Sequence, residues 1–341
     1  MLKEYFADLH IHIGRTEADE PVKITASRNL TFYNIAEEAS HRKGMDIIGI
    51  IDCHSPGVLR DIERCVQTGE MSEIEGGGLA FQNTTILLGS EIEVYDEGMS
   101  GPAHILAFLP NLKAMKQFSR WLGQHMTNVQ LSSQRIYASS SRLQAEVLAH
   151  EGLVIPAHIF TPHKGMYGAA TSQMAPFLDM NQIFAVELGL SADSLMAGHL
   201  AELNDLTFLS NSDAHSLAKI GREYNVLRLQ KPNFEEFKQA MKRENGRGVA
   251  ANYGLNPRLG KYHRTYCLKC EQILDGAEYL ARDSEVTCPN CQGSRFVIGV
   301  MDRVEEITDQ NPAVVPAHRP PYHYQVPLDF IPGLGRKTME K

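Results

Sequence analysis

Histidine and acidic side chains recur along the first 215 residues of the chain, each within or just after a short apolar run. The set comprises Asp8, His10, His12, Asp52, His54, Glu91, His104, His158, Glu187, Asp213 and His215. Imidazole and carboxylate groups together suit zinc, manganese or iron, and one carboxylate can bridge two ions. Because alternate residues of a strand point to one side, His10 and His12 are expected to face the same way. These residue types predict a metal centre.

Each of these residues also has a purely structural interpretation. A single histidine at the end of a strand is more often a hydrogen-bonded structural residue than a ligand, but placements in seven successive apolar runs are hard to explain in that way. Asp8 and Asp52 could orient a ligating imidazole instead of binding an ion. Glu187 suits a metal ligand, a pocket residue or a structural residue equally.

The runs that must position these side chains read as short strands. They are Tyr5–Leu9, Met45–Ile51, Thr85–Val94, Ala103–Phe108, Leu153–Ala157, Ile183–Leu188 and Leu206–Leu209. Helix-like segments lie between several of them, at residues 32–44, 112–126 and 141–152, and Ser141 and Gly152 suit the two caps of the last. Repeated strand, helix, strand predicts parallel α/β architecture, and about 240 residues suits a closed barrel whose strand ends surround one mouth. A doubly wound open sheet is the alternative.

The motifs in order resemble those of the polymerase and histidinol phosphatase (PHP) superfamily of metal-dependent phosphoesterases. They are Asp8-Leu-His10-Ile-His12, Asp52-Cys-His54, Gly89-Ser-Glu91, His104, Pro156-Ala-His158 and Ser212-Asp213-Ala-His215. The resemblance implies a distorted (β/α)7 barrel with two or three divalent ions, zinc, manganese or magnesium. One ion would lie among His10, His12, Glu91 and Asp213, a second among Glu91, His104 and His158, and a third near His54 and His215. No clear histidine follows the first motif to complete the third set.

Such a centre suits phosphodiester hydrolysis, because two ions about 3.5–4 Å apart activate a water and stabilise the attacking and leaving oxygens. We expect hydroxide held near Glu91 to attack phosphorus and leave 3′-hydroxyl and 5′-phosphate ends, with Asp213 or Asp8 assisting proton transfer or ligand orientation. The loops at residues 130–142 and 160–171 are candidates for a substrate pocket. They offer Gln134, Arg135, Tyr137, Lys164 and Tyr167, although loop polarity alone would also explain these residues.

Four cysteines near the C-terminus form a second motif, Cys267-Leu-Lys-Cys270 and Cys288-Pro-Asn-Cys291. Two such pairs predict one structural zinc ion bound by four thiolates, with a β-hairpin between the pairs. A redox pair is the competing interpretation of a single pair, and the doubled motif disfavours it. Cys53 and Cys65 lack a partner pattern and are expected to be buried thiols.

The net charge of −8 argues against nucleic-acid binding, but the charge is uneven. Residues 1–240 carry 19 basic and 29 acidic side chains, whereas the stretch from Lys242 to Lys269 carries seven basic residues against Glu244 alone. Aromatic residues are interleaved in this stretch, which predicts contacts with phosphates and bases, and a solvated linker is the alternative. We expect a barrel over residues 1–250, a zinc-binding domain over 262–300, and a Pro-rich segment with the start of a helix-hairpin-helix over 301–341.

The barrel, the zinc ribbon and the Pro-Gly-Leu-Gly segment together resemble the endonuclease Q family of DNA-repair enzymes. The resemblance implies a nick on the 5′ side of deaminated bases (hypoxanthine, uracil and xanthine) and of abasic sites, with such DNA and replication or repair proteins as partners. The alternatives are a small-molecule phosphatase similar to histidinol phosphatase, or a non-catalytic DNA- or polymerase-associated module. No apolar run is long enough to span a bilayer and no signal peptide is evident, so a cytoplasmic protein is expected.

Overall fold

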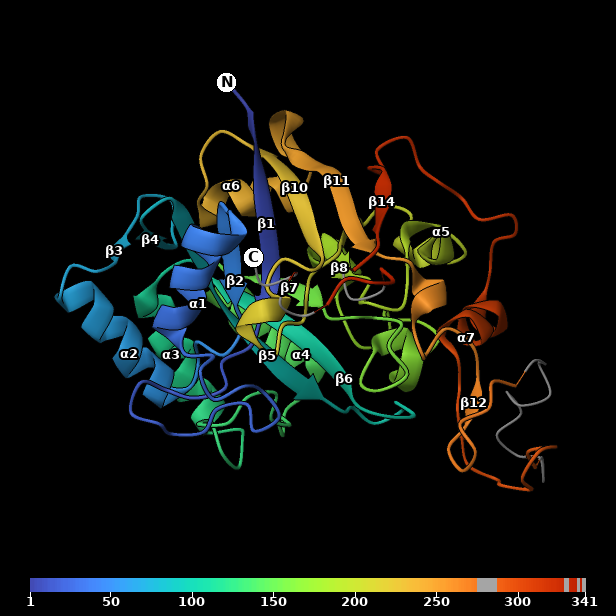
Figure 1. The fold of residues 1–341 in the computed structure, drawn as a ribbon. Coiled ribbons are helices and arrows are strands. Elements are labelled where there is room, and N and C mark those ends of the chain that lie inside the picture. The colour runs from blue at the N-terminus through green and yellow to red at the C-terminus, as the bar shows by residue number, and fades with distance from the viewer. Residues whose placement is uncertain (275–286, 328–330, 336–337, 339–341) are drawn as a thin grey trace.

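The computed structural model describes residues 1–274, 287–327, 331–335 and 338 as an α/β barrel with an appended metal-binding segment (Figure 1). Its strands are β1 (Lys3–Ile11), β2 (Ile47–Ile50), β3 (Ser72–Glu73), β4 (Leu79–Phe81), β5 (Thr84–Val94), β6 (Ala103–Leu109), β7 (Leu153–Pro156), β8 (Ala185–Glu187), β9 (Thr207–Leu209), β10 (Tyr224–Leu229), β11 (Gly248–Leu255), β12 (Tyr266–Cys267), β13 (Phe296–Val297) and β14 (Tyr322–Gln325). Its α-helices are α1 (Phe32–Glu38), α2 (Pro56–Gln67), α3 (Leu112–Gly123), α4 (Ser140–Ala149), α5 (Ser194–Ala197), α6 (Phe234–Met241) and α7 (Val300–Ile307).

All seven predicted runs form strands, and they curl into a nearly closed ring. β1, β2 and β5 pair in parallel, β5, β6 and β7 pair antiparallel, and β8 pairs with β9 in parallel. The ring closes beyond β9, where Ala214 N donates to His10 O and His12 N donates to Ala214 O, both at 3.1 Å. This closure excludes the open-sheet alternative.

The prediction of an all-parallel sheet is wrong for β6. Only residues 95–102 connect β5 to β6, whereas a parallel crossover needs a dozen residues or more. The chain therefore turns back beside β5. Glu91 and His104 consequently lie on adjacent strands that run in opposite directions, two register positions apart.

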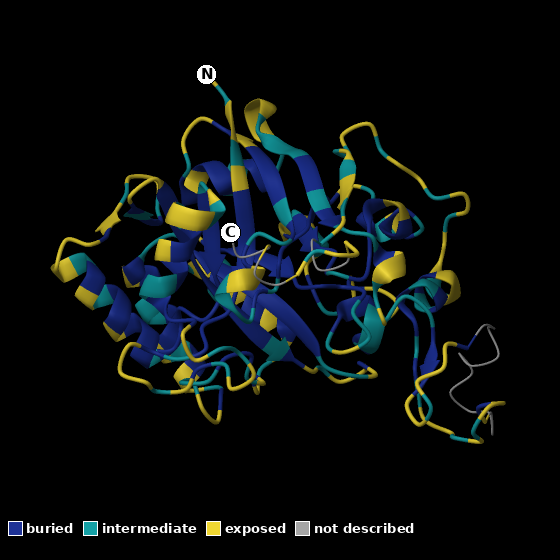
Figure 2. Cartoon of the chain, viewed as in Figure 1, coloured by how far each residue is buried: buried dark blue, intermediate teal, exposed yellow. Residues whose placement is uncertain are grey.

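Apolar side chains fill both the inside of the ring and the layer beneath the helices. The barrel strands are accordingly coloured mostly as buried in Figure 2. Along β2, Ile47 and Ile51 join an inner cluster, whereas Ile48 and Ile50 join the outer cluster under the helices. Helix α6 contributes Phe234, Phe237, Ala240 and Met241 to the inner cluster. One end of the barrel is therefore filled by apolar side chains, and the other is left to the polar residues.

Helix caps fix where the surrounding helices begin. The Asn111 side chain accepts from Ala114 N at the start of α3, which satisfies an amide that has no partner within the helix. The predicted N-cap of α4 is wrong by two residues: Ser139, not Ser141, accepts from Arg142 N. The helix ends one turn before Gly152, whose backbone approaches Phe108 O so closely that a Cβ would lie 2.7 Å from it.

The C-terminal third returns to the barrel rather than forming a separate unit. Residue 250, the expected barrel limit, lies inside β11, and β14 from the Pro-rich segment pairs in parallel with β11. Helix α7 packs Val300 and Val304 into the outer barrel cluster. The predicted hairpin between the cysteine pairs falls largely on residues 275–286, and most of the predicted helix-hairpin-helix start falls on residues 328–330, 336–337 and 339–341; these segments lie outside the described residues. No helix in the described part of the chain has the length and apolar character needed to cross a bilayer.

Glu223, just before β10, is a buried carboxyl that the strand pairing holds away from water. Its Oε1 accepts from Leu255 N at 2.7 Å, and its Oε2 has no hydrogen-bond partner. Burial raises the pKa of Glu223 well above its usual range, and the nearby Glu187 and Asp8 carboxylates raise it further. The folded protein therefore keeps a proton on Glu223 that the unfolded chain releases.

Glu223→Gln should stabilise the protein at neutral pH. A raised pKa in the folded state means that stability is lost as pH rises above the unfolded pKa of about 4.3, and the amide removes that loss. We expect a gain on the order of 1 kcal/mol or more at pH 7.5 that disappears near pH 4, measured by urea unfolding. The exposed control Glu37→Gln should show no such pH-dependent difference. A constant gain at both pH values would contradict the assignment.

Candidate metal centre

The carboxylate of Glu91, on β5, is the hub of the polar cluster at the mouth of the barrel. Its Oε1 lies 2.8 Å from His104 Nδ1, 3.2 Å from His158 Nε2 and 3.4 Å from His10 Nε2. Burial opposes its ionisation, but the His104 and Lys23 charges and the imidazole hydrogen bonds outweigh that effect and hold the pKa of Glu91 well below its usual range. The mouth therefore contains a fixed, fully buried negative charge.

Two groups of three residues around Glu91 have the geometry of metal-ligand sets. Atoms of His10, His12 and Asp213 lie within 4.8 Å of one another, and so do atoms of Glu91, His104 and His158. Asp213 Oδ1 is 3.3 Å from His12 Nε2 and 3.5 Å from His10 Nε2, and Glu91 Oε2 is 3.7 Å from His12 Nε2. The structure thus brings these six side chains into two groups. The second group has the members that the resemblance implied, whereas the first lacks Glu91, which the resemblance placed in both sets.

The donor set fits divalent cations. Within the described residues, His10 Nε2 and Asp213 Oδ1, which lie 3.5 Å apart in the first group, are buried without a hydrogen-bond partner. Buried polar atoms are rarely left unsatisfied, and imidazole with carboxylate is a donor set for zinc or manganese. These residues could therefore hold two ions.

The expected third set is less complete. His54 is fully buried and neither ring nitrogen has a hydrogen-bond partner, and burial lowers its pKa. His215 packs against His12 with ring centroids 4.6 Å apart and bonds through Nδ1 to Asp213 O at 2.9 Å. His54 and His215 do not join a third group with a carboxylate among the described residues.

Two carboxylates behind the ligands orient the imidazoles. Asp52 Oδ2 accepts from His12 Nδ1 at 3.1 Å and from Ile13 N at 2.8 Å. Glu187 lies beneath both groups, with His10 Nδ1 2.9 Å from its Oε2 and His158 N donating to the same oxygen at 3.0 Å. Burial opposes protonation of His10, but Glu187 and Asp213 raise its pKa well above the usual value. Glu187 thus occupies the structural role that the sequence left open.

A chain of buried amides extends this support to the far side of β1. Asn252 Nδ2 donates to Asn225 Oδ1, Asn225 Nδ2 donates to Asn211 Oδ1, and Asn211 Nδ2 donates to Glu187 Oε1, at 2.9, 2.9 and 3.1 Å. Each amide is completely buried. The orientation of Glu187 is therefore fixed by residues of β10 and β11 that contact neither ligand group.

The Asp8 carboxylate points away from the ligating imidazoles, which the sequence suggested it could orient. A bulge between Asp8 and Ile11 interrupts the strand period, so Leu9 joins the inner apolar cluster while His10 also faces the mouth. The Asp8 carboxylate accepts from Ser212 N at 3.1 Å and from Gly221 N at 2.8 Å. It anchors the loop that carries Asp213 and contacts no ligating imidazole, which argues against the expected role in proton transfer.

Lys23 and Ser133 also contact the Glu91 carboxylate, and neither residue was predicted from the sequence. Lys23 Nζ is 2.6 Å from Ser133 Oγ and 3.5 Å from Glu91 Oε2, and Ser133 Oγ donates to the same carboxylate oxygen. Both residues belong to loops without a metal-binding motif, so only their proximity in the fold identifies them. Ser133, His158 and Asp213 all have positive φ, at 52°, 29° and 45°. Such backbone conformations are costly and are concentrated at functional sites.

Four of the five predicted substrate residues lie at the rim of this mouth. The backbone of Gln134 and Ile136 pairs with Glu93 at the end of β5, and the Arg135 guanidinium lies over the rings of Tyr95 and Tyr137. Lys164 Nζ is 2.7 Å from Glu93 Oε2, and Lys164 O accepts from His104 N. Tyr167 is the exception, because it is buried and its hydroxyl donates to Glu202 at 2.5 Å.

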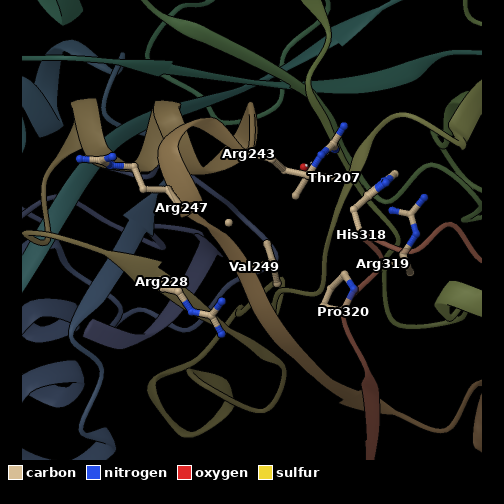
Figure 3. Close-up of a pocket in the computed structure, with 10 residues that line it drawn as sticks. Thr207, Arg228, Arg243, Arg247, Val249, His318, Arg319 and Pro320 are labelled. Carbon is tan, nitrogen blue, oxygen red and sulfur yellow. Dashed lines mark hydrogen bonds between the residues drawn. The ribbon is translucent and has the colours of Figure 1, made fainter. Parts of the chain in front are cut away.

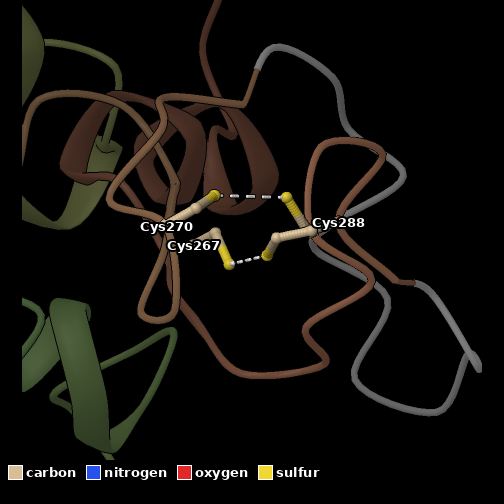
Figure 4. Close-up of side chains that lie close together, drawn as sticks. Cys267, Cys270 and Cys288 are labelled. Carbon is tan, nitrogen blue, oxygen red and sulfur yellow. Dashed lines mark hydrogen bonds between the residues drawn. The ribbon is translucent and has the colours of Figure 1, made fainter.

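The four cysteines of the appended segment converge (Figure 4). The Sγ atoms of Cys267 and Cys291 are 3.6 Å apart, as are those of Cys270 and Cys288, and all four fit within 4.8 Å. These separations are too long for disulfides and match the edge of about 3.8 Å expected for a ZnS4 tetrahedron with Zn–S bonds of about 2.3 Å. Backbone N–H groups of Cys270 and Lys269 lower the pKa of Cys267 to about 7, which favours the ligating thiolate.

Comparison with known proteins extends these observations along the chain. A family model described as PHP-associated matches residues 194–245. The uncharacterized protein YqxK of Bacillus subtilis is 50% identical over 341 residues, all of this chain and 86% of that protein. The uncharacterized protein MJ0043 of Methanocaldococcus jannaschii is 45% identical over 153 residues, 42% of this chain and 18% of that protein.

Two solved structures match almost the whole chain. The lesion-specific endonuclease PfuEndoQ from Pyrococcus furiosus gives a TM-score of 0.80 at 29% identity, over 95% of this chain and 76% of that one. Endonuclease Q in complex with a 27-mer duplex substrate with an abasic lesion at the active site gives 0.78 at 29% identity, over 94% and 76%. The fold and the site define a PHP-type metal-dependent phosphoesterase. More narrowly, the chain belongs to the endonuclease Q family.

Glu187→Gln should weaken metal binding without unfolding the barrel. The carboxylate accepts from His10, His158 N and Asn211, and an amide of the same shape would turn an NH2 group toward one of these donors. We expect metal affinity to fall by about 10- to 100-fold, measured by competition with a chromophoric chelator. Glu38, the last residue of α1, has a buried carboxylate that pairs with Arg42 in the next turn, and it provides the control Glu38→Gln. Unchanged affinity in Glu187→Gln would contradict the proposed support.

Cys288→Ser should remove one zinc ion per chain and leave the barrel metals bound. Three thiolates make a poorer tetrahedral site, and structural zinc supplies folding energy to small domains. Elemental analysis gives the stoichiometry, and limited proteolysis should show faster cleavage within residues 262–300 only. Cys65→Ser is the matched control, since burial raises the pKa of that thiol to about 11 and it has no cysteine partner. Equal zinc content in both variants would rule out the four-cysteine site.

Proposed function

We propose that this protein is a DNA-repair endonuclease that hydrolyses the phosphodiester on the 5′ side of deaminated bases and abasic sites. The deaminated bases are hypoxanthine, uracil and xanthine, and the products carry 3′-hydroxyl and 5′-phosphate ends. The observation that carries the proposal is the pair of ligand groups joined by Glu91 at an open barrel mouth. The solved relative with an abasic duplex at its active site supports DNA as the substrate.

The residues of the centre have distinct roles in this reaction. His10, His12 and Asp213 would hold one ion and Glu91, His104 and His158 a second, and two divalent ions supply an activated water and neutralise phosphate charge. Asp213 has an exposed fraction of 30%, in contrast to 1% for Glu91, so within the two ligand groups it is the residue most accessible to an incoming phosphate. Lys23, which is 17% exposed, adds a fixed positive charge beside Glu91. Glu187 and Asp52 keep the imidazoles aligned during the reaction.

The rim offers surfaces for an unpaired nucleotide. The Arg135 guanidinium lies 4.8 Å from the ring centroid of Tyr95 and 5.7 Å from that of Tyr137, and both rings are exposed. Exposed aromatic rings next to an arginine suit base stacking and phosphate contact. A nucleotide must leave the duplex before its phosphodiester reaches a recessed centre, and this costs least where pairing is already weak. Damaged and abasic positions meet that condition.

The basic stretch contributes to this surface only in part. Lys261 lies over Tyr262 and Tyr266, and Tyr262 packs edge-on against His163 of the loop after β7. Arg264 is instead paired with Asp302 at 2.5 Å. Residues 258–263 are therefore the part of the stretch that we assign to DNA, and binding should be strongly salt-dependent.

Duplexes with a single abasic site, hypoxanthine or uracil test the proposal. With divalent metal present, the full chain should nick the DNA on the 5′ side of the lesion. A DNA ligase should be able to reseal the nick, because its ends are a 3′-hydroxyl and a 5′-phosphate. Asp213→Ala should lower the rate by about a thousandfold or more, because it removes one of the three ligands of the first ion and leaves the residues at the rim unchanged.

The control is Lys113→Ala, an exposed lysine near the start of α3 and outside both candidate substrate loops, which should cleave like the unmodified protein. Hydrolysis of histidinol phosphate with every duplex left intact would overturn the proposal in favour of a small-molecule phosphatase. Full nicking activity in Asp213→Ala would place the chemistry outside this mouth.

A further inference from the structure

Figure 3 shows a pocket lined by basic side chains. It lies at the end of the barrel opposite the metal centre. Its volume is about 210 Å³, and its walls come from the start of β9, the end of β10, the loop after α6 and the Pro-rich segment. Arg228 of β10 is paired in register with Glu4, eight residues before His12 along β1. At a rise of about 3.3 Å per residue, roughly 25 Å separates the pocket from the metal centre.

Five side chains that can carry positive charge line this pocket: Arg228, Arg243, Arg247, His318 and Arg319. Arg247 is neutralised by a bidentate pair with Glu236, with both distances 2.7 Å. Arg228 is 51% exposed and only 3.7 Å from the exposed Glu4. Arg243 and Arg319 have no carboxylate within 4.0 Å among the described residues.

Backbone oxygens, rather than acids, hold the two unpaired guanidinium groups in place. Arg319 donates to Leu206 O at 2.6 Å and to Leu203 O at 3.1 Å, and it stacks 3.2 Å from the centroid of Phe208. Arg243 donates to Asp205 O at 2.8 Å and to Thr207 Oγ1 at 3.0 Å. One short loop thus fixes both cations side by side and leaves each with further N–H donors.

This arrangement costs stability unless an anion joins it. Burial and the neighbouring Arg243 charge lower the pKa of Arg319 to about 10. Burial and the two arginines also lower the pKa of His318. Burial also lowers the pKa of Arg243, and the Asp205 carboxylate only partly opposes this effect. Planar guanidinium groups held in a fixed orientation suit bidentate recognition of phosphate oxygens.

We propose that this pocket is a binding site for a phosphate group, separate from the metal centre. The pocket is large enough for inorganic phosphate or for the phosphate and sugar of a mononucleotide, and Val249 and Pro320 give it an apolar wall. The same chemistry could also be supplied by a phosphodiester of a polynucleotide. Its distance from the mouth favours a free phosphate compound, because a duplex engaged at the centre would have to bend around the barrel. The inference does not depend on the proposed function.

Titration calorimetry of the full chain tests the proposal with three probes: inorganic phosphate, a deoxynucleoside monophosphate and a short oligonucleotide with unmodified bases. The measurements use the Asp213→Ala background, which lacks one of the three residues of the first ligand group and so weakens phosphate binding at the metal centre. We expect one saturable phosphate site that Arg319→Gln or Arg228→Gln weakens by about tenfold or more. Arg120→Gln, an exposed arginine of α3, is the matched control and should leave binding unchanged.

The outcomes separate cleanly. Binding of phosphate and the mononucleotide that depends on Arg228 or Arg319 supports a site for free phosphate compounds. Dependence seen only with the oligonucleotide supports the phosphate site but assigns it to a polynucleotide. Equal binding in Arg120→Gln and Arg228→Gln, or no saturable binding with any probe, would overturn the proposal. Arg228 makes no buried contact, so its variant keeps the test decisive even if Arg319→Gln fails to fold.

Discussion

The buried charge on Glu91 is the constraint around which the barrel mouth is organised. A carboxylate cannot remain ionised away from water unless cations or hydrogen-bond donors surround it. Here the donors come from β1, β6 and the loop after β7, with Lys23 and Ser133 closing the remaining side. Divalent ions would satisfy the same demand more fully. The strands therefore have to bring distant segments to a single carboxylate, and the ring of strands does so.

The sequence predicted the seven barrel strands and the six grouped ligands, because buried strands and their polar ends leave a strong local pattern. It did not predict that β6 runs antiparallel, since pairing direction depends on the length of the connection. The bulge in β1 was also invisible in the sequence, so Asp8 was expected to orient an imidazole or assist proton transfer. Lys23, Ser133 and the buried position of Tyr167 depend on how loops pack, and loop polarity does not report this.

The C-terminal third is tied to the barrel more closely than its composition suggested. Arg303 of α7 donates to Tyr167 O at 2.8 Å and to Thr171 O at 3.2 Å. The helix that follows the cysteine cluster is therefore hydrogen-bonded to the loop after β7. That loop also carries Lys164 at the rim. The cysteine cluster is thus connected to the barrel mouth through α7 and the loop after β7. The basic stretch from Lys242 to Lys269 is divided, because Arg243 and Arg247 lie at the opposite end of the barrel.

Barrel closure beside β1 has a consequence for how the protein is made. The contacts that complete the ring join His10 and His12 to Ala214, and Asp8 to Ser212 across 204 residues. Contacts of such long range form late in folding, because the entropy of loop closure must be overcome first. During synthesis from the N-terminus, the histidines of β1 emerge long before Asp213. The ribosome-bound chain therefore carries an incomplete first group, and only closure of the ring brings Asp213 to His10 and His12.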